Sequence, residues 1–460
     1  MTVWRGKNIL VIGAARQGLA ATRYFSKNGA NVTLNDGREK TYFQDVIENL
    51  NNQAIKFHFG SHPSTLLVDK DMICVSGGVP LDIPLLKEAL KRNIPLTNDA
   101  QIFIEGTKAK VIGITGSAGK TTTTTFIGEI AKKAVQPHHK VWVGGNIGVP
   151  LIEHIEDISE NDWVVMELSS FQLELMTTSP HIALILNITP NHLDRHGTMA
   201  AYISSKGNIL KYQKAEDIAI LNRDEENSIS FKEKVKGKLL TFGWGETKSD
   251  YYGTFIKEGF IHYSLSNRPK RIMPIDKINL PGKHNQANTL AACAAGIAAG
   301  FPVESIRAGI ESVHGIPHRL ELVATKNNIR WYNDSIATAP ERVIAALEAI
   351  HGPLVLLLGG RDKNLPWEKL AQIISSRHPK LILFGEAGNM IENTLRRDMF
   401  CGESFRIDRY KNLDDAVHRA AEIAEPGESV LLSPGGTSYD AFIDFEERGN
   451  IFKKLVEEIA

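Results

Sequence analysis

The segment from residue 111 to 122 carries the residue types of a phosphate-binding loop. An apolar run, Val111-Ile112-Gly113-Ile114, indicates a buried parallel strand, and the string Thr-Gly-Ser-Ala-Gly-Lys-Thr-Thr follows it. Backbone N–H groups, the N-terminus of the next helix and Lys120 would surround a phosphate, and the Thr121 hydroxyl can hold Mg²⁺. The loop is shorter than G-x-x-x-x-G-K-[ST], because Gly116 is its first usable glycine. The alternative is a plain Gly/Thr turn before a helix.

Two later segments follow predicted strands and carry further polar groups. Glu167 stands near the end of the apolar strand 163–168, where ligands bind in open α/β sheets, so it is placed to bind Mg²⁺ beside a triphosphate. Strand 182–187 is followed by His192, Asp194 and His196, and we expect a metal ligand or catalytic group among them. The alternatives are a capping or ion-paired Glu167 and a plain loop.

Asn285 and Asn288 share one face of a predicted helix and could hydrogen-bond a nucleobase. The alternative is helix capping, the usual role of asparagine near a helix start.

The N-terminal segment has the pattern of a βαβ unit that binds a dinucleotide. Strand 8–13 leads into Gly13-Ala14-Ala15-Arg16-Gln17-Gly18 and a helix, and a second strand, 31–34, is followed by Asp36. The fingerprint is damaged, because Ala15 stands at its middle glycine. Ser76-Gly77-Gly78-Val79-Pro80 resembles a turn that lines a ligand, with an ordinary tight turn as the alternative.

Composition limits the class of protein. The 460 residues include 53 basic and 53 acidic side chains, a balance that argues against a surface for nucleic acid. Three widely spaced cysteines suit a reducing compartment. No signal peptide is evident, and the longest run of low polarity, 289–300, is too short to span a bilayer. We therefore expect a soluble cytoplasmic protein with no membrane or nucleic-acid partner.

Strands alternate with helices along the chain, which indicates an α/β fold with mostly parallel, doubly wound sheets. The expected domains are residues 1–105, 106–315 and 316–460. The last of these has predicted strands at 331–335, 354–358, 381–384 and 430–432.

These motifs together resemble the Mur ligases of peptidoglycan synthesis, over essentially the whole chain. The shared elements are the T-G-x-x-G-K-T-T loop, Glu167, the segment 191–196, the string His-Asn-x-x-Asn at 284–288, His318-Arg319 and Asp334. The resemblance implies a Rossmann-like N-terminal domain for a UDP-sugar, a central P-loop-type domain for ATP and Mg²⁺, and a Rossmann-like C-terminal domain for an amino acid.

Other residues resemble the members of the family that add D-glutamate. They are the segment 333–338, Gly359-Gly360-Arg361-Asp362-Lys363, Leu432-Ser433-Pro434 and the segment 438–442. The implied reaction is ATP-dependent addition of D-glutamate to UDP-N-acetylmuramoyl-L-alanine through an acyl phosphate, in cytoplasmic peptidoglycan precursor synthesis. The sequence departs from the family at Ile336, where many members have Lys, at Tyr439, where many have Phe, and at the turn 76–80.

The resemblance also implies roles for individual residues. Lys120, His192 and Lys206 are expected to be catalytic, and Lys206 to be carbamylated so that it helps hold the second of two Mg²⁺ ions. The expected ATP-binding residues are Gly116, Ser117, Ala118, Gly119, Lys120, Thr121, Thr122, Asn285, Asn288, Arg319 and Asp334. Those expected at the UDP-substrate are Ala14, Ala15, Arg16, Asp36, Ser76, Gly77 and Asn146. D-glutamate would be held by Lys363, Ser433 and Tyr439, and metal by Thr121, Glu167, His192 and Lys206.

Three other readings stay open at this point. A sister ligase of the same fold would add a different amino acid. An NAD-dependent oxidoreductase rests on Gly13, Gly18 and Asp36 alone. A non-catalytic nucleotide switch would keep Lys120 but has no use for the carboxylates or the third domain. The partners that we expect are UDP-N-acetylmuramoyl-L-alanine and D-glutamate, bound by a monomer.

Overall fold

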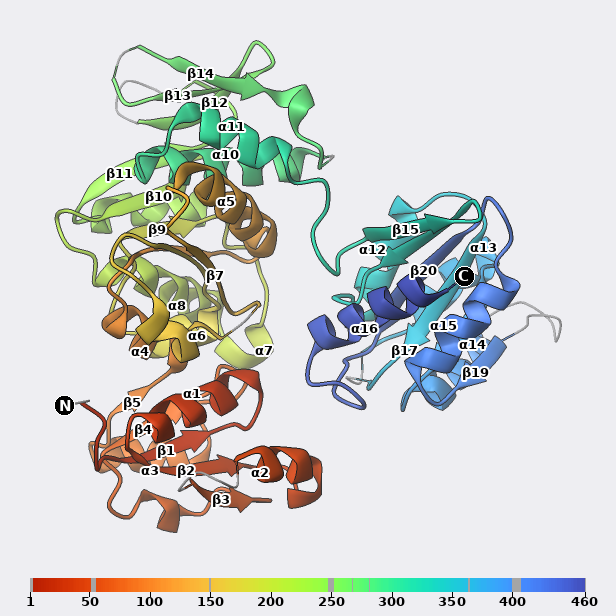
Figure 1. The fold of residues 1–460 in the computed structure, drawn as a ribbon, viewed down its shortest axis with the longest axis horizontal. Helices are drawn as coiled ribbons and strands as arrows, with labels where there is room; N and C mark the ends of the chain where they lie inside the picture. Colours follow the sequence, from red (N-terminus) through yellow and green to blue (C-terminus); the bar gives the residue numbers. More distant parts are fainter. Residues whose placement is uncertain are drawn as a thin grey trace. The chain divides into compact units, whose positions relative to one another are not determined.

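The computed structural model describes residues 3–50, 55–148, 150–246, 252–266, 268–280, 282–362, 365–398 and 407–459, without the side chains of residues 45, 194 and 398. The chain divides into two compact units, residues 1–314 and 315–460. The described residues form three sheets, of five and nine strands in the first unit and six in the second (Figure 1).

The five-stranded sheet is parallel throughout, in the order β3-β2-β1-β4-β5. Its strands are β1 Asn8–Ile12, β2 Asn31–Asp36, β3 Ile55–Phe59, β4 Met72–Val75 and β5 Leu96–Thr97. The helices that accompany it are α1 Arg16–Lys27, α2 Gln44–Leu50, α3 Pro84–Lys91 and α4 Asp99–Gly106, with the 3₁₀ turns η1 Lys40–Phe43 and η2 Ser64–Leu67. Helix α1 packs on one face of β1 and α3 on the other, which explains why β1 is apolar on both faces.

The nine-stranded sheet has the order β14-β13-β12-β11-β10-β9-β6-β8-β7, and its neighbouring strands pair parallel except for β12 with β13 and β13 with β14, which pair antiparallel. Its strands are β6 Lys110–Thr115, β7 Val141–Gly145, β8 Trp163–Glu167, β9 Ile182–Ile185, β10 Ile218–Asn222, β11 Lys238–Phe242, β12 Gly253–Lys257, β13 Phe260–Ser264 and β14 Lys270–Pro274. The helices are α5 Lys120–Ala134, α6 Ser170–Leu175, α7 Leu193–His196, α8 Met199–Lys211, α9 Glu226–Ile229, α10 Lys283–Ala298 and α11 Val303–Glu311, and the 3₁₀ turns are η3 Leu151–Asp157, η4 Ser230–Lys234 and η5 Ile275–Lys277. Helices α4, α6 and α8 share one apolar core with β6, β8 and β9, whereas α5, α10 and α11 pack together.

The second unit is built on a six-stranded sheet in the order β15-β16-β20-β17-β18-β19, with only β15 antiparallel. Its strands are β15 Glu321–Lys326, β16 Ile329–Asn333, β17 Leu354–Gly359, β18 Lys380–Phe384, β19 Ile407–Tyr410 and β20 Ser429–Gly435. Its helices are α12 Pro340–Ala349, α13 Glu368–Arg377, α14 Gly388–Asp398, α15 Leu413–Ile423 and α16 Phe445–Glu458. Helices α12, α13 and α14 share a core with one face, and α15 and α16 with the other.

The predicted fold class, α/β with mostly parallel, doubly wound sheets, is confirmed. Strand limits differ in detail: β2 runs on to Asp36, and β9 ends at Ile185 instead of Asn187. Beyond that strand end, the Asn187 side chain contacts the phosphate loop, and its carbonyl accepts from the Ser117 N–H at 2.9 Å. The antiparallel strands β13 and β14 extend the sheet beyond the predicted pattern.

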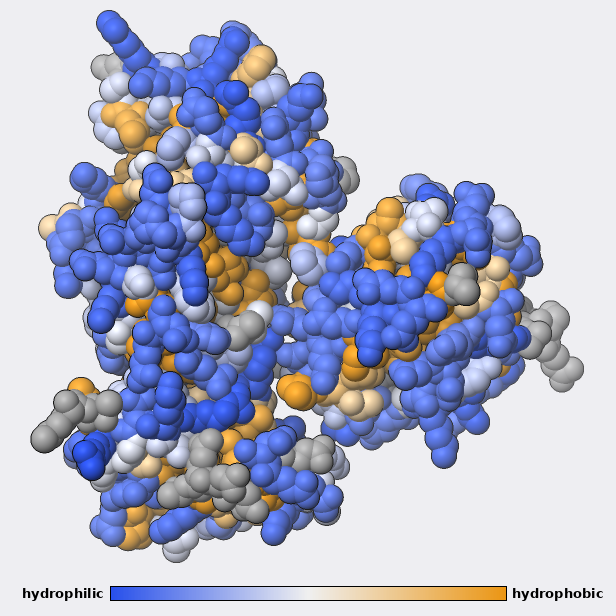
Figure 2. All heavy atoms as spheres, in the orientation of Figure 1, coloured by the Kyte–Doolittle hydropathy of each residue, from blue (hydrophilic) through white to orange (hydrophobic). Residues whose placement is uncertain are grey.

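Hydrophilic residues cover most of the face shown in Figure 2. Cys74 and Cys293 are free and buried, whereas Cys401 lies outside the described residues. Within the described part of the chain, no helix is long and apolar enough to cross a membrane.

Candidate functional site

The predicted phosphate loop lies between the end of β6 and the first turn of α5. Gly119 caps the helix with a φ of +84°, a left-handed conformation that favours glycine. A Cβ atom built at Gly119 would lie only 2.2 Å from Oδ1 of Asn288, in the second turn of α10. The loop therefore touches the helix that carries the predicted base-binding asparagines, and any other residue at 119 would strain the backbone and displace the Asn288 side chain.

The Lys120 ammonium group folds back over the loop. Its Nζ donates to the Gly116 carbonyl at 2.9 Å and lies 3.5 Å from the Ser117 carbonyl. A cation at this place faces any anion that the loop N–H groups bind. The geometry therefore fits a phosphate cradle better than a plain turn.

The segment after β9 holds the loop in shape. Asn187 accepts from the Ala118 N–H at 2.9 Å and donates to the Ala118 carbonyl at 3.0 Å. The Ser117 hydroxyl accepts from the Thr189 N–H at 3.0 Å and lies 3.0 Å from the Tyr202 hydroxyl. Our sequence analysis missed the role of Asn187. Its position just after an apolar strand was the only available signal.

Glu167 brings two predicted groups together at the end of β8. Its side chain is 2% exposed; Oε2 accepts from the Thr121 hydroxyl and Oε1 from the Asn146 side-chain amide, both at 2.9 Å. Carboxylate and hydroxyl oxygens are the ligands that Mg²⁺ prefers, and Mg²⁺ commonly completes its shell with phosphate and water. The oxygen atoms of Glu167 and Thr121 therefore fit Mg²⁺ as ligands. Among the described residues, no group of three or more His, Cys, Asp or Glu side chains is arranged to hold a metal.

Asn146 connects this centre with the N-terminal sheet. We expected it at the UDP-substrate, and the structure places its side chain on Glu167, while its carbonyl accepts from Arg16 Nη2 at 3.3 Å. Gln17 of α1 also donates, at 3.4 Å, to the carbonyl of Gly145. The β7 end thus lies between the two predicted binding regions.

Lys206 is a buried residue of α8, not a surface lysine. It is 1% exposed, and its Nζ donates to the Gly116 carbonyl at 2.9 Å, the same oxygen that Lys120 contacts. Burial, and then the positive charge of Lys120, lower the pKa of Lys206 to about 6, although Glu167 acts in the opposite direction. At neutral pH its amine is therefore mostly uncharged.

His192 precedes helix α7, in the segment that follows β9, whereas Glu167 ends the neighbouring part of the sheet at β8. His192 is exposed and has a φ of +54°, which is uncommon for a residue with a side chain. Its ring meets the ring of Phe171 edge-on at 5.1 Å, and His196 stacks on Phe171 at 5.2 Å. His196 Nε2 also lies 3.0 Å from the Ser170 hydroxyl. The loop is therefore ordered around an aromatic ring.

The ends of β1, β2 and β4 assemble the predicted UDP-substrate residues. Asp36 accepts from the Ala14 N–H at 2.8 Å and from the Arg38 guanidinium at 2.9 and 3.0 Å. Burial alone would raise the pKa of Asp36, but the bonds from Arg38 and Ala14 outweigh it and lower the pKa. The Ser76 hydroxyl donates to the Gly13 carbonyl at 3.1 Å. Protein donors therefore already occupy the carboxylate that a dinucleotide site would offer to a ribose.

In the second unit, a hydrogen bond links two predicted site residues, Asp334 and Ser433. Asp334, 4% exposed, accepts from the Ser433 hydroxyl at 2.8 Å and from the Leu320 N–H at 3.1 Å. Burial raises the pKa of Asp334 to about 6, against the lowering effect of these bonds and of Arg319 and Arg342. Tyr439 is 52% exposed, and Lys363 lies outside the described residues.

Arg448 organises the same end of the second unit, and our sequence analysis missed it. The side chain is fully buried; Nη2 donates to the Ser335 carbonyl at 2.9 Å, and both Nη atoms donate to the Gly436 carbonyl at 3.2 Å. Burial lowers the pKa of Arg448 to about 10. No sequence signal marked it, because an arginine in an amphipathic helix usually faces solvent.

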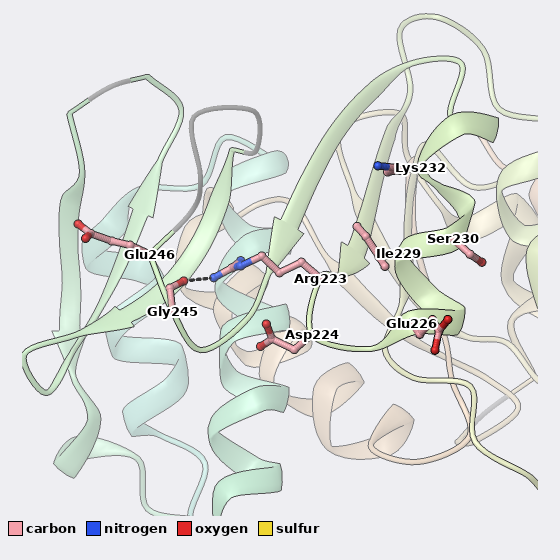
Figure 3. A pocket seen from close by; sticks show the side chains of 8 residues that line it. All are labelled: Arg223, Asp224, Glu226, Ile229, Ser230, Lys232, Gly245 and Glu246. Carbon is pink, nitrogen blue, oxygen red and sulfur yellow. Dashed lines mark hydrogen bonds between the residues drawn. The ribbon is translucent and has the colours of Figure 1, made fainter.

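A separate cavity of about 490 Å³ lies beside the ends of β10 and β11 (Figure 3). It is lined by Arg223, Asp224, Glu226, Ile229, Ser230, Lys232, Gly245 and Glu246. Arg223 donates to the Gly245 carbonyl across it. The lining contains none of the predicted site residues, so the cavity stays apart from the phosphate loop.

Three family models match consecutive parts of the chain. The Mur ligase MurD-like N-terminal domain matches residues 7–98, the Mur ligase middle domain residues 114–296, and the Mur ligase glutamate ligase domain residues 318–436. The chain belongs to the Mur ligase family.

Similar Mur ligases align with almost the full chain. The UDP-N-acetylmuramoylalanine--D-glutamate ligase of Symbiobacterium thermophilum is 38% identical over 450 residues, covering 98% of each chain. The enzyme of the same name from Koribacter versatilis is 37% identical over 458 residues, covering 99% of this chain and 98% of its own.

Solved Mur ligases share the fold at lower sequence identity. MurF from Acinetobacter baumannii has a TM-score of 0.58 and 18% identity, covering 86% of this chain and 87% of its own. UDP-N-acetylmuramate-alanine ligase MurC from Thermotoga maritima has a TM-score of 0.55 and 17% identity, covering 98% and 99%. These likenesses support the three-domain α/β architecture.

Proposed function

We propose that this Mur ligase joins D-glutamate to UDP-N-acetylmuramoyl-L-alanine at the expense of ATP, in peptidoglycan precursor synthesis. The observation that carries the proposal is the match over 98% of the chain to a ligase named for D-glutamate. The phosphate loop, with Lys120 over it and Thr121 on Glu167, supplies the site that such a reaction needs.

The chemistry follows from the poor reactivity of a carboxylate toward an amine. A carboxylate oxygen of the UDP-substrate attacks the γ-phosphorus of ATP, and ADP leaves, which gives an acyl phosphate. The D-glutamate nitrogen then attacks the acyl carbon, loses a proton, and phosphate leaves as the amide bond forms. Lys120 and the loop N–H groups neutralise charge on the phosphoryl group during its transfer.

The loop side of the site also fits a divalent cation. We infer that Thr121 and Glu167 would hold one Mg²⁺, which would supply positive charge beside the phosphates of ATP. His192 and a carbamate on Lys206 complete a second metal position in this proposal. The support from the structure is that Lys206 is buried against the phosphate loop instead of facing solvent.

Each predicted domain takes one substrate in this proposal. Residues 1–105 hold the UDP-sugar, residues 106–315 hold ATP and residues 316–460 hold D-glutamate. Asn285 and Asn288 contact the adenosine part of ATP, and Arg319 and Asp334 contact ATP from the last domain. Lys363, Ser433 and Tyr439 grip D-glutamate.

Phosphate release tests the proposal directly. Purified chain is incubated with UDP-N-acetylmuramoyl-L-alanine, ATP, Mg²⁺ and D-glutamate, and each component is omitted in turn. We expect phosphate and the new amide only in the complete mixture. A panel of other amino acids in place of D-glutamate separates this reaction from that of a sister Mur ligase, and faster turnover with another amino acid would overturn the proposed specificity.

The N-terminal sheet is expected to bind a uridine nucleotide and not NAD. Ala15 stands where a dinucleotide site needs glycine for close approach of a pyrophosphate, and Arg38 already occupies Asp36. Titration calorimetry with UDP, UDP-N-acetylmuramoyl-L-alanine and NAD measures this preference. Tighter binding of NAD than of UDP would favour an oxidoreductase instead.

A further inference from the structure

Arg195, in the short helix α7, joins two parts of the first unit that are far apart in sequence. Its Nη1 donates to the Gly77 carbonyl at 3.0 Å and its Nη2 to the Val79 carbonyl at 2.5 Å. The guanidinium group also lies 4.0 Å from the centroid of the Phe171 ring. One side chain thus contacts the turn after β4 and the first turn of α6.

The turn after β4 belongs to the predicted UDP-substrate region. The Val79 N–H donates to the Ser76 carbonyl at 2.9 Å, and the Ser76 hydroxyl donates to the Gly13 carbonyl. A Cβ at Gly13 would lie 2.9 Å from both Ser76 and Val79, so this turn packs tightly on the β1–α1 turn. Arg195 therefore holds a backbone segment that is already fixed to the N-terminal sheet.

Phe171, the other contact of Arg195, lies in helix α6 near the predicted metal site. It follows Glu167 by four residues, in a helix whose start is fixed by reciprocal bonds between Ser169 and Gln172. Its ring contacts His192 and His196. Stacking on this ring therefore ties Arg195 to both strand ends that carry predicted metal ligands.

We propose that Arg195 is a positioning residue that sets the span between the UDP-sugar turn, Gly77 to Val79, and the phosphate-transfer centre around His192 and Glu167. The inference rests on the proposed function, because one substrate must reach both places. Its nucleotide lies on the N-terminal sheet while its carboxylate meets the γ-phosphate of ATP. Small errors in such a span lower the rate strongly, since the reacting atoms must approach closely.

Arginine suits this role and lysine does not. Two N–H groups of one planar guanidinium reach two carbonyls, while the same plane stacks on an aromatic ring. A lysine keeps the charge but presents a point cation that cannot make both bonds and the stack together. A positive charge at position 195 is therefore not enough to hold the turn and the ring together.

Steady-state kinetics on Arg195→Ala and Arg195→Lys test the inference. We expect kcat/KM for UDP-N-acetylmuramoyl-L-alanine to fall about 10- to 100-fold in both variants. The KM for ATP should stay within about twofold of the wild-type value, because the phosphate loop is untouched. If Arg195 had a purely structural role, its loss would instead impair the kinetic constants for both substrates alike and lower the melting temperature.

Arg23→Gln is the matched control. Arg23 of α1 pairs with Glu153 of η3, another contact between the two parts of the first unit, away from the turn at Gly77. We expect its kinetics to stay near wild type. If the wild-type enzyme is active and Arg195→Ala has normal kinetics, the inference about Arg195 is overturned and the proposed function stands. Full activity of Arg195→Lys would have the same meaning. A wild-type chain that binds no UDP-sugar in calorimetry would overturn the inference together with the proposed function.

Discussion

Replacing Lys120 by alanine is expected to abolish ligation while leaving the UDP-substrate bound. Its ammonium group lies over the phosphate loop, 2.9 Å from the Gly116 carbonyl, whereas the residues predicted at the UDP-substrate, apart from Asn146, lie at strand ends of the N-terminal sheet. Loss of a charge that stabilises the transferring phosphoryl group costs several kcal/mol of barrier, on the order of 10²-fold or more in rate. Phosphate release and calorimetry with UDP-N-acetylmuramoyl-L-alanine measure the two effects separately.

Lys132→Ala serves as the control for this variant. Lys132 lies in the last turn of the same helix, α5, where it is exposed and pairs with Glu129 at 2.7 Å. An exposed pair of this kind contributes about 1 kcal/mol or less to stability, so turnover should be unchanged. If Lys120→Ala turned over at near the wild-type rate, the loop could not be the ATP site.

Lys206→Ala is expected to be nearly inactive, and a short carboxylic acid in the buffer should restore part of the activity. An ammonium ion beside Mg²⁺ would be repelled by roughly 4 kcal/mol per unit charge at about 4 Å with an effective dielectric of 20. A carbamate reverses that sign and offers oxygen ligands. The lowered pKa of Lys206 leaves a neutral amine, the form that combines with CO₂. Acetate or formate titrated into the variant measures the rescue.

A lysine elsewhere in α8 separates this effect from general damage to the helix. Lys211 is the last residue of α8 and lies at its exposed end, so Lys211→Ala should keep its activity with or without added acid. Mass spectrometry of the native wild-type enzyme should show an increment of one CO₂. Full activity of Lys206→Ala without any acid would remove the second metal position from the proposal.

The groups that sequence predicts well are those whose position follows from one strand end. The phosphate loop and Glu167 are such cases, because parallel strands bring their carboxyl ends to one edge of a sheet. The structure adds that Thr121 bonds Glu167 and that Lys206 is buried against the loop. Both facts depend on packing between elements, which a local pattern does not contain.

The residues that sequence reasoning missed act through partners distant along the chain. Asn187 bonds Ala118, Arg195 bonds Gly77 and Val79, and Arg448 bonds Ser335. Each recognises backbone atoms, whose availability depends on the tertiary fold and not on residue type. Asn146 has a further contact that the sequence did not indicate: its side chain donates to Glu167, while its carbonyl accepts from Arg16 near the N-terminal sheet.

The contact between Gly119 and Asn288 has a consequence for how this sequence can change over generations. Any side chain at position 119 collides with Asn288, and shortening Asn288 leaves the left-handed backbone of Gly119 in place. That backbone costs a non-glycine residue about 1 to 2 kcal/mol. No single compensating mutation at position 288 therefore opens position 119. A non-glycine residue at 119 therefore keeps its backbone cost whatever residue stands at 288.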